Sequence, residues 1–151
     1  MKKLSTLTIV GALALALAAG AAAHRVVTIK GTHGADALTG TPANDRVLAR
    51  GGNDTVAAGD GRDRVWAGRG DDTVDGGGGD DVLRGNRGAD VQRGGDGDDR
   101  LHALARDRKT DTIDCGPGHD VVWLNAKEQD THVNCEVVKT VTVRRGDGGD
   151  S

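Results

Sequence analysis

The sequence predicts an all-β solenoid, a fold in which short strands from successive repeats stack into a coil. Between residues 31 and 103 an aspartate returns every nine positions without a miss. A glycine stands two residues before seven of these eight aspartates, and an apolar residue stands two residues after seven of them. A fixed period of this kind decides the fold before any local secondary structure is assigned. The aspartates are Asp36, Asp45, Asp54, Asp63, Asp72, Asp81, Asp90 and Asp99.

Residues 1–23 have the features of a secretory signal peptide. Lys2 and Lys3 precede an apolar run, and Ala21 and Ala23 form an A-x-A cleavage pattern. The run is about 13 residues long, whereas a helix needs roughly 20 to span a bilayer. We therefore expect cleavage near Ala23, a secreted mature chain and no stable membrane anchor.

The composition excludes a conventional hydrophobic core. The chain has 25 glycines, no Phe, no Tyr and two Trp among 151 residues. Because glycine loses much backbone entropy on folding, so few large apolar groups cannot offset that cost by burial alone. Another interaction must hold the repeats together.

The charge balance argues against a nucleic-acid partner. Without Lys2 and Lys3 the chain has 18 basic and 23 acidic residues, a net charge of −5. Its arginines are interspersed among aspartates along the sequence, whereas binding to phosphates requires clustered Lys and Arg.

Each nine-residue unit predicts one tight turn and one short strand. The glycine before each aspartate allows a backbone with positive φ, and the three residues after the aspartate form a strand whose central side chain points inward. Two units make a coil of 18 residues, so residues i and i+18 stack about 4.8 Å apart.

This stacking sorts the side chains into rows. Four aspartates lie along each edge of the coil, and two apolar ladders fill the interior. The ladders are Leu38, Val56, Val74 and Gln92 on one side and Val47, Val65, Leu83 and Leu101 on the other. Gln92 is the exception, because a buried unpaired amide is costly. Either Val91 turns inward there or the Gln92 amide finds partners.

The stacked aspartates require a cation. Like charges about 5 Å apart repel by roughly 1 kcal/mol in water and roughly 3 kcal/mol at an effective dielectric constant of 20. A hard divalent ion that accepts six or more oxygen ligands reverses this effect. Calcium fits best, because exported proteins meet it and because the repeats contain no His or Cys cluster that would suggest zinc or copper.

At this point the chain resembles the RTX, or hemolysin-type, calcium-binding family, whose repeat is G-G-x-G-x-D-x-U-x. Residues 76–83 and 94–101 follow that pattern closely, and residues 31–45 are similar to the way such arrays begin. The resemblance implies a right-handed parallel β-roll over residues 24–103 that is usually disordered without calcium. It also implies that the eight periodic aspartates and turn carbonyls bind Ca²⁺ at about six internal sites, three gaps per edge.

The period breaks after Leu101 and resumes at Asp111 and Asp120, whose metal binding stays open. We interpret residues 104–143 as degenerate repeats and a C-terminal cap, and residues 144–151 as a disordered tail. Cys115 and Cys135 are the only cysteines, so an exported chain is expected to join them in a disulfide that clips the cap. The alternation of Val137, Val141 and Val143 predicts a final strand over residues 137–143.

An enzyme is not expected. Serines occur only at positions 5 and 151, and the carboxylates are committed to a cation on a rod with no evident cleft. The favoured function is a secreted calcium-binding protein with a structural, surface or matrix role. The alternative is a calcium-dependent binding or adhesion module that recognises a glycan or protein partner with one flat face. An ice-binding threonine array is not expected, because the outward positions along the chain read Ala37, Arg46, Thr55, Arg64, Thr73 and Val82.

Overall fold

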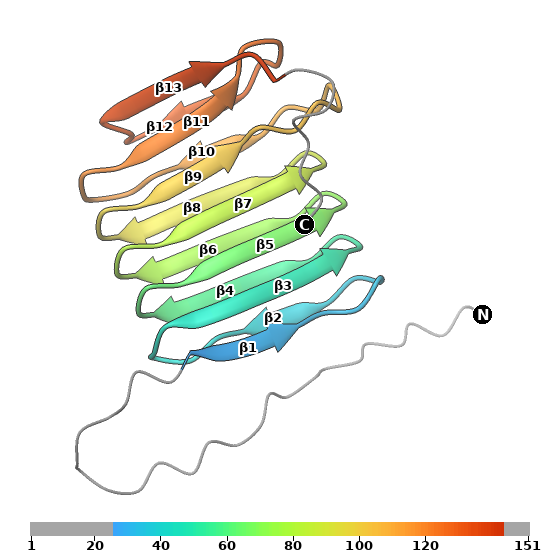
Figure 1. Ribbon diagram of the computed structural model, residues 1–151, viewed down its shortest axis with the longest axis vertical. Coiled ribbons are helices and arrows are strands. Elements are labelled where there is room, and N and C mark those ends of the chain that lie inside the picture. Colours follow the sequence, from blue (N-terminus) through green and yellow to red (C-terminus); the bar gives the residue numbers. More distant parts are fainter. Residues whose placement is uncertain (1–25, 144–151) are drawn as a thin grey trace, which may run out of the picture.

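The computed structural model describes residues 26–143, so the expected signal peptide and tail lie outside the described residues. The chain forms two β-sheets of parallel strands, which face each other along the whole length of the roll (Figure 1). The seven-stranded sheet contains, in order, β1 (Val27–Lys30), β3 (Asp45–Gly51), β5 (Arg64–Arg69), β7 (Val82–Arg87), β9 (Arg100–Ala103), β11 (Val121–Asn125) and β13 (Val137–Val141). The six-stranded sheet contains β12 (Thr131–Val133), β10 (Thr112–Asp114), β8 (Val91–Asp96), β6 (Thr73–Gly78), β4 (Thr55–Asp60) and β2 (Ala37–Thr39).

The chain alternates between the two sheets, and every strand pair is parallel. Within the repeats the register joins residues 18 positions apart, as in Val47 with Val65 and Val56 with Val74. This pairing confirms the predicted coil and gives a parallel β-solenoid of about 6 turns.

The interior consists of the two predicted ladders. Val65, Val74, Leu83 and Leu101 have no accessible surface, and the remaining apolar ladder residues are also buried. A second layer of small side chains lies beside them, formed by Ala49, Ala58, Ala67 and Ala103. The interior therefore consists of medium-sized aliphatic side chains and methyl groups, with no aromatic ring among the buried residues of the described chain.

Strands β3 to β8 are longer than the three residues predicted, with six or seven residues each. In β4 the pairing continues beyond the bend after Ala58, since Gly59 and Asp60 align with Gly77 and Gly78 of β6. The turn glycines behave as predicted from the third turn onward, with φ between 109° and 135° at Gly52, Gly61, Gly70, Gly79, Gly88 and Gly97. Gly34 and Ala43 in the first two turns do not adopt positive φ.

Gln92 remains in the ladder and finds a partner. Its side chain is fully buried, and Nε2 donates a hydrogen bond to the carbonyl oxygen of His102 at 3.2 Å. Val91 stays on the outer face, where it aligns with Thr73. Of the two alternatives predicted, the Gln92 amide finds a partner and Val91 does not turn inward.

The segment after the repeats keeps the same architecture. Gln92 pairs with Ile113 and Leu101 with Val122, so the three extra residues are absorbed by the loop before Asp111. The predicted Cys115–Cys135 disulfide is present, with Cα atoms 5.2 Å apart. It lies near the end of the roll, where β13 adds a last strand with all of its residues exposed. No helix among residues 26–143 is long and apolar enough to cross a membrane.

The outer faces of the two sheets differ in composition, which is not apparent from the order of residues along the chain. The six-stranded sheet carries one outward row of Ala37, Thr55, Thr73, Val91, Thr112 and Thr131, in which Val91 interrupts the threonines. The neighbouring row contains Asp75, Arg93 and Asp114. Arginines that are scattered in the sequence gather on the outer face of the seven-stranded sheet, because successive units alternate between faces.

Candidate metal centre

The eight predicted aspartates lie in two continuous rows, one along each edge of the roll. The N–H of Asp36 donates to Oδ1 of Asp54 at 2.8 Å, and each later aspartate repeats this bond with the one a coil further on. One row is Asp36, Asp54, Asp72 and Asp90, and the other is Asp45, Asp63, Asp81 and Asp99. The bonds measure 2.7 to 3.0 Å, so Oδ1 has a structural partner throughout.

The second oxygen of each interior carboxylate has no hydrogen-bond partner. Oδ2 is buried and unpartnered in Asp54, Asp63, Asp72, Asp81, Asp90 and Asp99. Such a repeated deficit is unusual, because buried polar atoms in native proteins almost always have partners. Each of these atoms is available to a positive ion.

Backbone carbonyl oxygens lie close to the unpartnered Oδ2 atoms. A Cβ atom added at Gly76 would clash with both Asp81 Oδ2 and the carbonyl oxygen of Gly94. At Gly94 the same atom would meet Asp99 Oδ2 and the carbonyl oxygen of Cys115. Carboxylate and carbonyl oxygens thus converge beside a glycine that leaves space for them.

Among residues 26–143, no three His, Cys, Asp or Glu side chains converge in a cluster that would hold a metal ion. The available donors are single carboxylates supplemented by carbonyl oxygens. This donor set suits a hard cation such as calcium and does not suit zinc, which takes nitrogen and sulfur ligands in a tetrahedron.

The electrostatics of the rows also point to a cation. Burial, and then the charges of stacked neighbours, raise the pKa of Asp72 and of Asp81 from 3.8 to about 7. Burial, and then the charges of nearby aspartates, raise the pKa of Asp63, Asp90 and Asp99 to about 6, against the opposing effect of the backbone hydrogen bond to Oδ1. Without a compensating ion, the ionised rows are therefore unfavourable.

The first aspartate of each row is in a different environment. Oδ2 of Asp36 accepts the N–H of Thr32 at 2.5 Å and its hydroxyl at 3.0 Å. Oδ2 of Asp45 is bound in the same way by Thr41, at 2.5 and 3.1 Å. These two carboxylates are satisfied by the protein itself.

The rows continue beyond the region predicted from the period. Asp90 donates its N–H to Asp111, which donates to Asp130, both at 2.9 Å. On the other edge, Asp99 donates to Asp120 and Asp120 to Glu136, both at 2.8 Å. Oδ2 is again buried without a partner in Asp120 and Asp130. Burial raises the pKa of Asp111 to about 8.

The sequence contains only part of the signal for this extension. Asp111 and Asp120 follow from the 18-residue period once the insertion of three residues is added. The separations from Asp111 to Asp130 and from Asp120 to Glu136 are 19 and 16 residues, so no single period finds the last two carboxylates.

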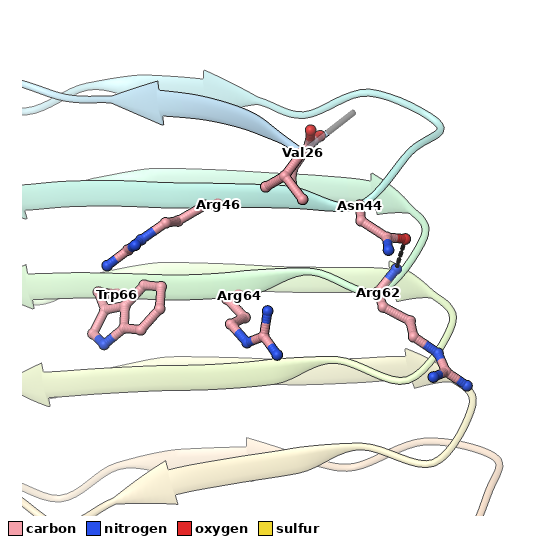
Figure 2. A pocket seen from close by; sticks show the side chains of 7 residues that line it. Val26, Asn44, Arg46, Arg62, Arg64 and Trp66 are labelled. Carbon is pink, nitrogen blue, oxygen red and sulfur yellow. Dashed lines mark hydrogen bonds between the residues drawn. The ribbon is translucent and has the colours of Figure 1, made fainter. Parts of the chain in front are cut away.

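A further set of polar side chains bridges the turns. Asn44 Oδ1 accepts the N–H of Arg62 at 2.9 Å (Figure 2), and Asp80 Oδ1 accepts the N–H of Asp98 at 3.2 Å. Asn53, Asp71 and Asp98 do the same at the other turns. These exposed hydrogen bonds give the five residues a role in linking coils.

Comparison with known proteins agrees with this geometry. A family model described as the RTX calcium-binding nonapeptide repeat matches residues 30–65, 58–92 and 75–105. Comparison with curated proteins and with solved structures gave no match. The matched stretches coincide with the coils whose aspartates form the two edge rows, and repeats of this family bind Ca²⁺. By sequence and by fold, this chain belongs to the family of RTX calcium-binding nonapeptide-repeat proteins.

Proposed function

We propose that this chain is a secreted calcium-binding structural protein that folds when it meets calcium outside the cell. The observation that carries the proposal is the repeated buried Oδ2 atom without a partner. The proposed side-chain ligands are Asp54, Asp63, Asp72, Asp81, Asp90 and Asp99. Carbonyl oxygens of the turns would complete each coordination shell.

The ends of the rows differ from this central set. Asp36 and Asp45 belong to the ligand set, but we expect weaker sites there because threonine N–H and hydroxyl groups already occupy Oδ2. Asp111, Asp120, Asp130 and Glu136 lengthen each row by two gaps. The original three gaps per edge, about six internal sites, would then become five per edge.

Calcium binding would be coupled to folding. A roll with so small an apolar interior gains little from hydrophobic burial, and its stacked carboxylates repel when ionised. An ion that binds only the folded chain contributes its binding free energy to folding. Extracellular calcium modules work at 10⁻⁴ to 10⁻³ M, so export would provide the signal to fold.

The role we assign is structural, at a cell surface or in an extracellular matrix. Proteins of this repeat family are generally non-catalytic and are typically extracellular. The signal-like segment at residues 1–23 supports export. A rod stiffened by an abundant extracellular ion suits such a role.

The test is far-UV circular dichroism of the full chain during a calcium titration, with magnesium as the control and calorimetry for stoichiometry. We expect a cooperative coil-to-β transition at four to ten ions per chain, with no transition in magnesium. A spectrum that does not respond to calcium, whether folded or disordered, would overturn both the ligand assignment and the folding switch.

The second candidate function is a calcium-dependent binding module. The observation that favours it is the concentration of arginines on one outer face, which the calcium rows do not require. Pull-down from native medium with and without calcium separates the two functions, because only a binding module retains a partner in a calcium-dependent way.

A further inference from the structure

The outer face of the seven-stranded sheet is strongly basic. In the two outward rows that contain Arg46 and Trp66, six side chains are cationic and none is acidic, although the chain as a whole has a net charge of −3. We call this surface the basic face and define it by Lys30, Arg46, Arg64, Trp66, Arg84, Arg100, His102, Trp123 and Lys139. The corresponding two rows of the opposite sheet have two aspartates and one arginine, and Asp60 and Asp96 are exposed at the ends of its strands, so the charges are segregated by face.

The cations of the basic face are not neutralised by carboxylates of the described residues. None of the six forms a salt bridge with residues 26–143, whereas Arg62, at the adjoining turn, pairs with Asp80 at 2.7 Å. Arg84 also has a buried Nε–H without a hydrogen-bond partner. Unpaired cations held side by side on adjacent strands repel each other and favour an anionic ligand.

Aromatic rings hold three of these cations in place. The guanidinium carbons of Arg46 and Arg84 lie 4.9 and 5.7 Å from the ring centroid of Trp66. Further along the same row, His102 stacks on Trp123 at 4.6 Å and Lys139 lies 5.0 Å from the Trp123 ring. Cation–π contacts restrict the long side chains before a ligand arrives, which lowers the entropy cost of binding.

One end of the basic face is hollowed. A shallow hollow of about 450 Å³ is lined by Arg46, Arg64 and Trp66, and Arg62 lies at its far side. Figure 2 shows how these side chains lie. The cationic rows run from this hollow along the roll axis, across strands β1 to β13. Six strand spacings make this track about 29 Å long, and it is straight because the strands stack in register.

We propose that the basic face binds a linear acidic polysaccharide that lies along the roll axis, with its carboxylate or sulfate groups against the arginines. This inference rests on the proposed function, since the face exists only in the folded roll. Guanidinium groups recognise such planar or tetrahedral anions through two parallel hydrogen bonds. A straight track to which six of the seven strands each contribute one cation matches a straight and repetitive polyanion.

Two other kinds of polyanionic ligand, single-stranded nucleic acid and an anionic membrane, fit the basic face less well. Single-stranded nucleic acid binds largely by stacking bases on open aromatic faces, but here neighbouring cations and His102 cover faces of the two tryptophans. An anionic membrane surface favours apolar side chains that insert. Among residues 26–143, the exposed large apolar residues lie at the ends of the roll, at Val26, Val27, Val133, Val137, Val138 and Val141.

The test measures binding of the calcium-loaded full chain to dextran sulfate, hyaluronan and neutral dextran by calorimetry at two chloride concentrations. The double variant Arg64→Gln/Arg100→Gln removes two exposed charges of the basic face. Arg93→Gln/Lys109→Gln removes two exposed charges elsewhere and is the matched control. Circular dichroism with calcium verifies that every variant folds.

We expect binding to at least one acidic polymer, none to dextran, and weakening as chloride rises. The basic-face variant should bind roughly tenfold more weakly and lose about two units of salt slope, by analogy with removing two phosphate contacts. The control should stay within about twofold, since its charges lie off the track. Dextran sulfate and hyaluronan distinguish sulfate from carboxylate recognition.

Three outcomes would overturn the inference while leaving the calcium roll intact: no binding by the folded chain, equal weakening in both double variants, or tighter binding to single-stranded DNA or anionic vesicles at the same salt. Failure of calcium to fold the chain is a separate result that overturns the proposed function instead.

Discussion

At the scale of single residues, each interior aspartate has two different oxygens. In Asp81, Oδ1 accepts the N–H of Asp63 at 2.8 Å and fixes the spacing of the coils, while Oδ2 is buried without a partner. The first function needs only an acceptor, whereas the second needs a negative charge. Substitution by asparagine therefore separates them.

We predict that Asp81→Asn weakens calcium-induced folding while Asp75→Asn does not. Asparagine at position 81 keeps an acceptor for the Asp63 N–H but removes a charged calcium ligand, so the calcium midpoint should rise about tenfold or more. Asp75 is exposed on the outer face of β6 and serves as the control. The measurement is a calcium titration followed by circular dichroism, and equal midpoints for both variants would contradict the ligand assignment.

The turn glycines provide a second prediction at this scale. Gly79 has a φ of 112°, and a Cβ there would collide with the carbonyl oxygen of Gly61. Gly51 does not adopt positive φ, and a Cβ there would have only ordinary contacts, the nearest at 3.6 Å from the Arg69 carbonyl oxygen.

Gly79→Ala should destabilise the calcium-loaded roll by about 2–4 kcal/mol, because it combines backbone strain with a steric clash. Gly51→Ala should be neutral or slightly stabilising. Thermal unfolding in saturating calcium checks both, and a Gly79→Ala melting temperature equal to that of the unaltered chain would refute this account of the turns.

At the scale of elements, the sequence predicts the regular coils well and the irregular ones poorly. The aspartate period identifies both edge rows and both ladders, because one rule, i with i+18, governs every coil between Leu38 and Leu101. It does not anticipate that the strands extend beyond the bend, since that pairing depends on backbone groups rather than on side-chain type.

The ends of the rows are hidden for a different reason. Thr32 and Thr41 change the first two turns through hydrogen bonds to aspartate, an effect of local geometry that no repeat pattern contains. Glu136 joins its row at an irregular separation, held next to the disulfide at Cys135. Residues that do not follow the repeat period can be assigned to a row only from their contacts in the folded structure.

We predict that the disulfide stabilises the last coil and leaves the central repeats unaffected. Closing a loop with a sequence separation of 20 contributes roughly 3 kcal/mol in the chain-entropy model. In Cys115→Ala/Cys135→Ala, alanine at position 115 fits the buried layer that Ala49, Ala58 and Ala67 form elsewhere. In a solenoid each coil contacts only its neighbours, so the loss should remain local.

Hydrogen exchange in calcium tests this expectation. Amides of β12 and β13 should exchange faster in the double alanine variant, while β4 to β7 keep their protection. Loss of protection throughout the roll would mean that the C-terminal coil is needed for folding of the whole, and unchanged exchange would mean that the disulfide adds nothing.

At the scale of the whole molecule, the roll has acidic edges, one basic face and one face rich in threonine. These surfaces are invisible in the linear sequence because neighbouring repeats contribute to opposite sheets. Arg46 and Arg64 lie side by side although Thr55, on the other sheet, separates them in sequence. The net charge of the chain therefore says little about what either face can bind.

The charge distribution of the edges leads to a prediction about pH in the absence of calcium. The pKa values of Asp63, Asp72, Asp81, Asp90 and Asp99 are raised to about 6 or 7 in the folded chain, mainly by burial. A carboxyl group whose pKa is higher in the folded state takes up a proton on folding. Its contribution to stability is complete below about pH 4 and is lost as the pH rises through 6 to 7.

His102 has the opposite effect on the pH dependence of folding stability. Burial, and then the charges of Arg84 and Arg100, lower its pKa from 6.5 to about 4. Its contribution is present above pH 6.5 and is lost as the pH falls through 4. One histidine opposes five aspartates, so the aspartates should dominate between pH 8 and pH 5.

We therefore predict that acid partly replaces calcium. The calcium-free full chain, prepared by exhaustive dialysis, should gain β-structure as the pH is lowered from 8 to about 5, because protons neutralise the stacked carboxylates. With calcium present the trend should reverse, since protons compete for the same oxygens and the calcium midpoint rises as the pH falls through 7 to 6. Circular dichroism at each pH, with and without calcium, measures both effects. A calcium-free chain that is more ordered at pH 8 than at pH 5 would show that repulsion between the rows does not limit folding.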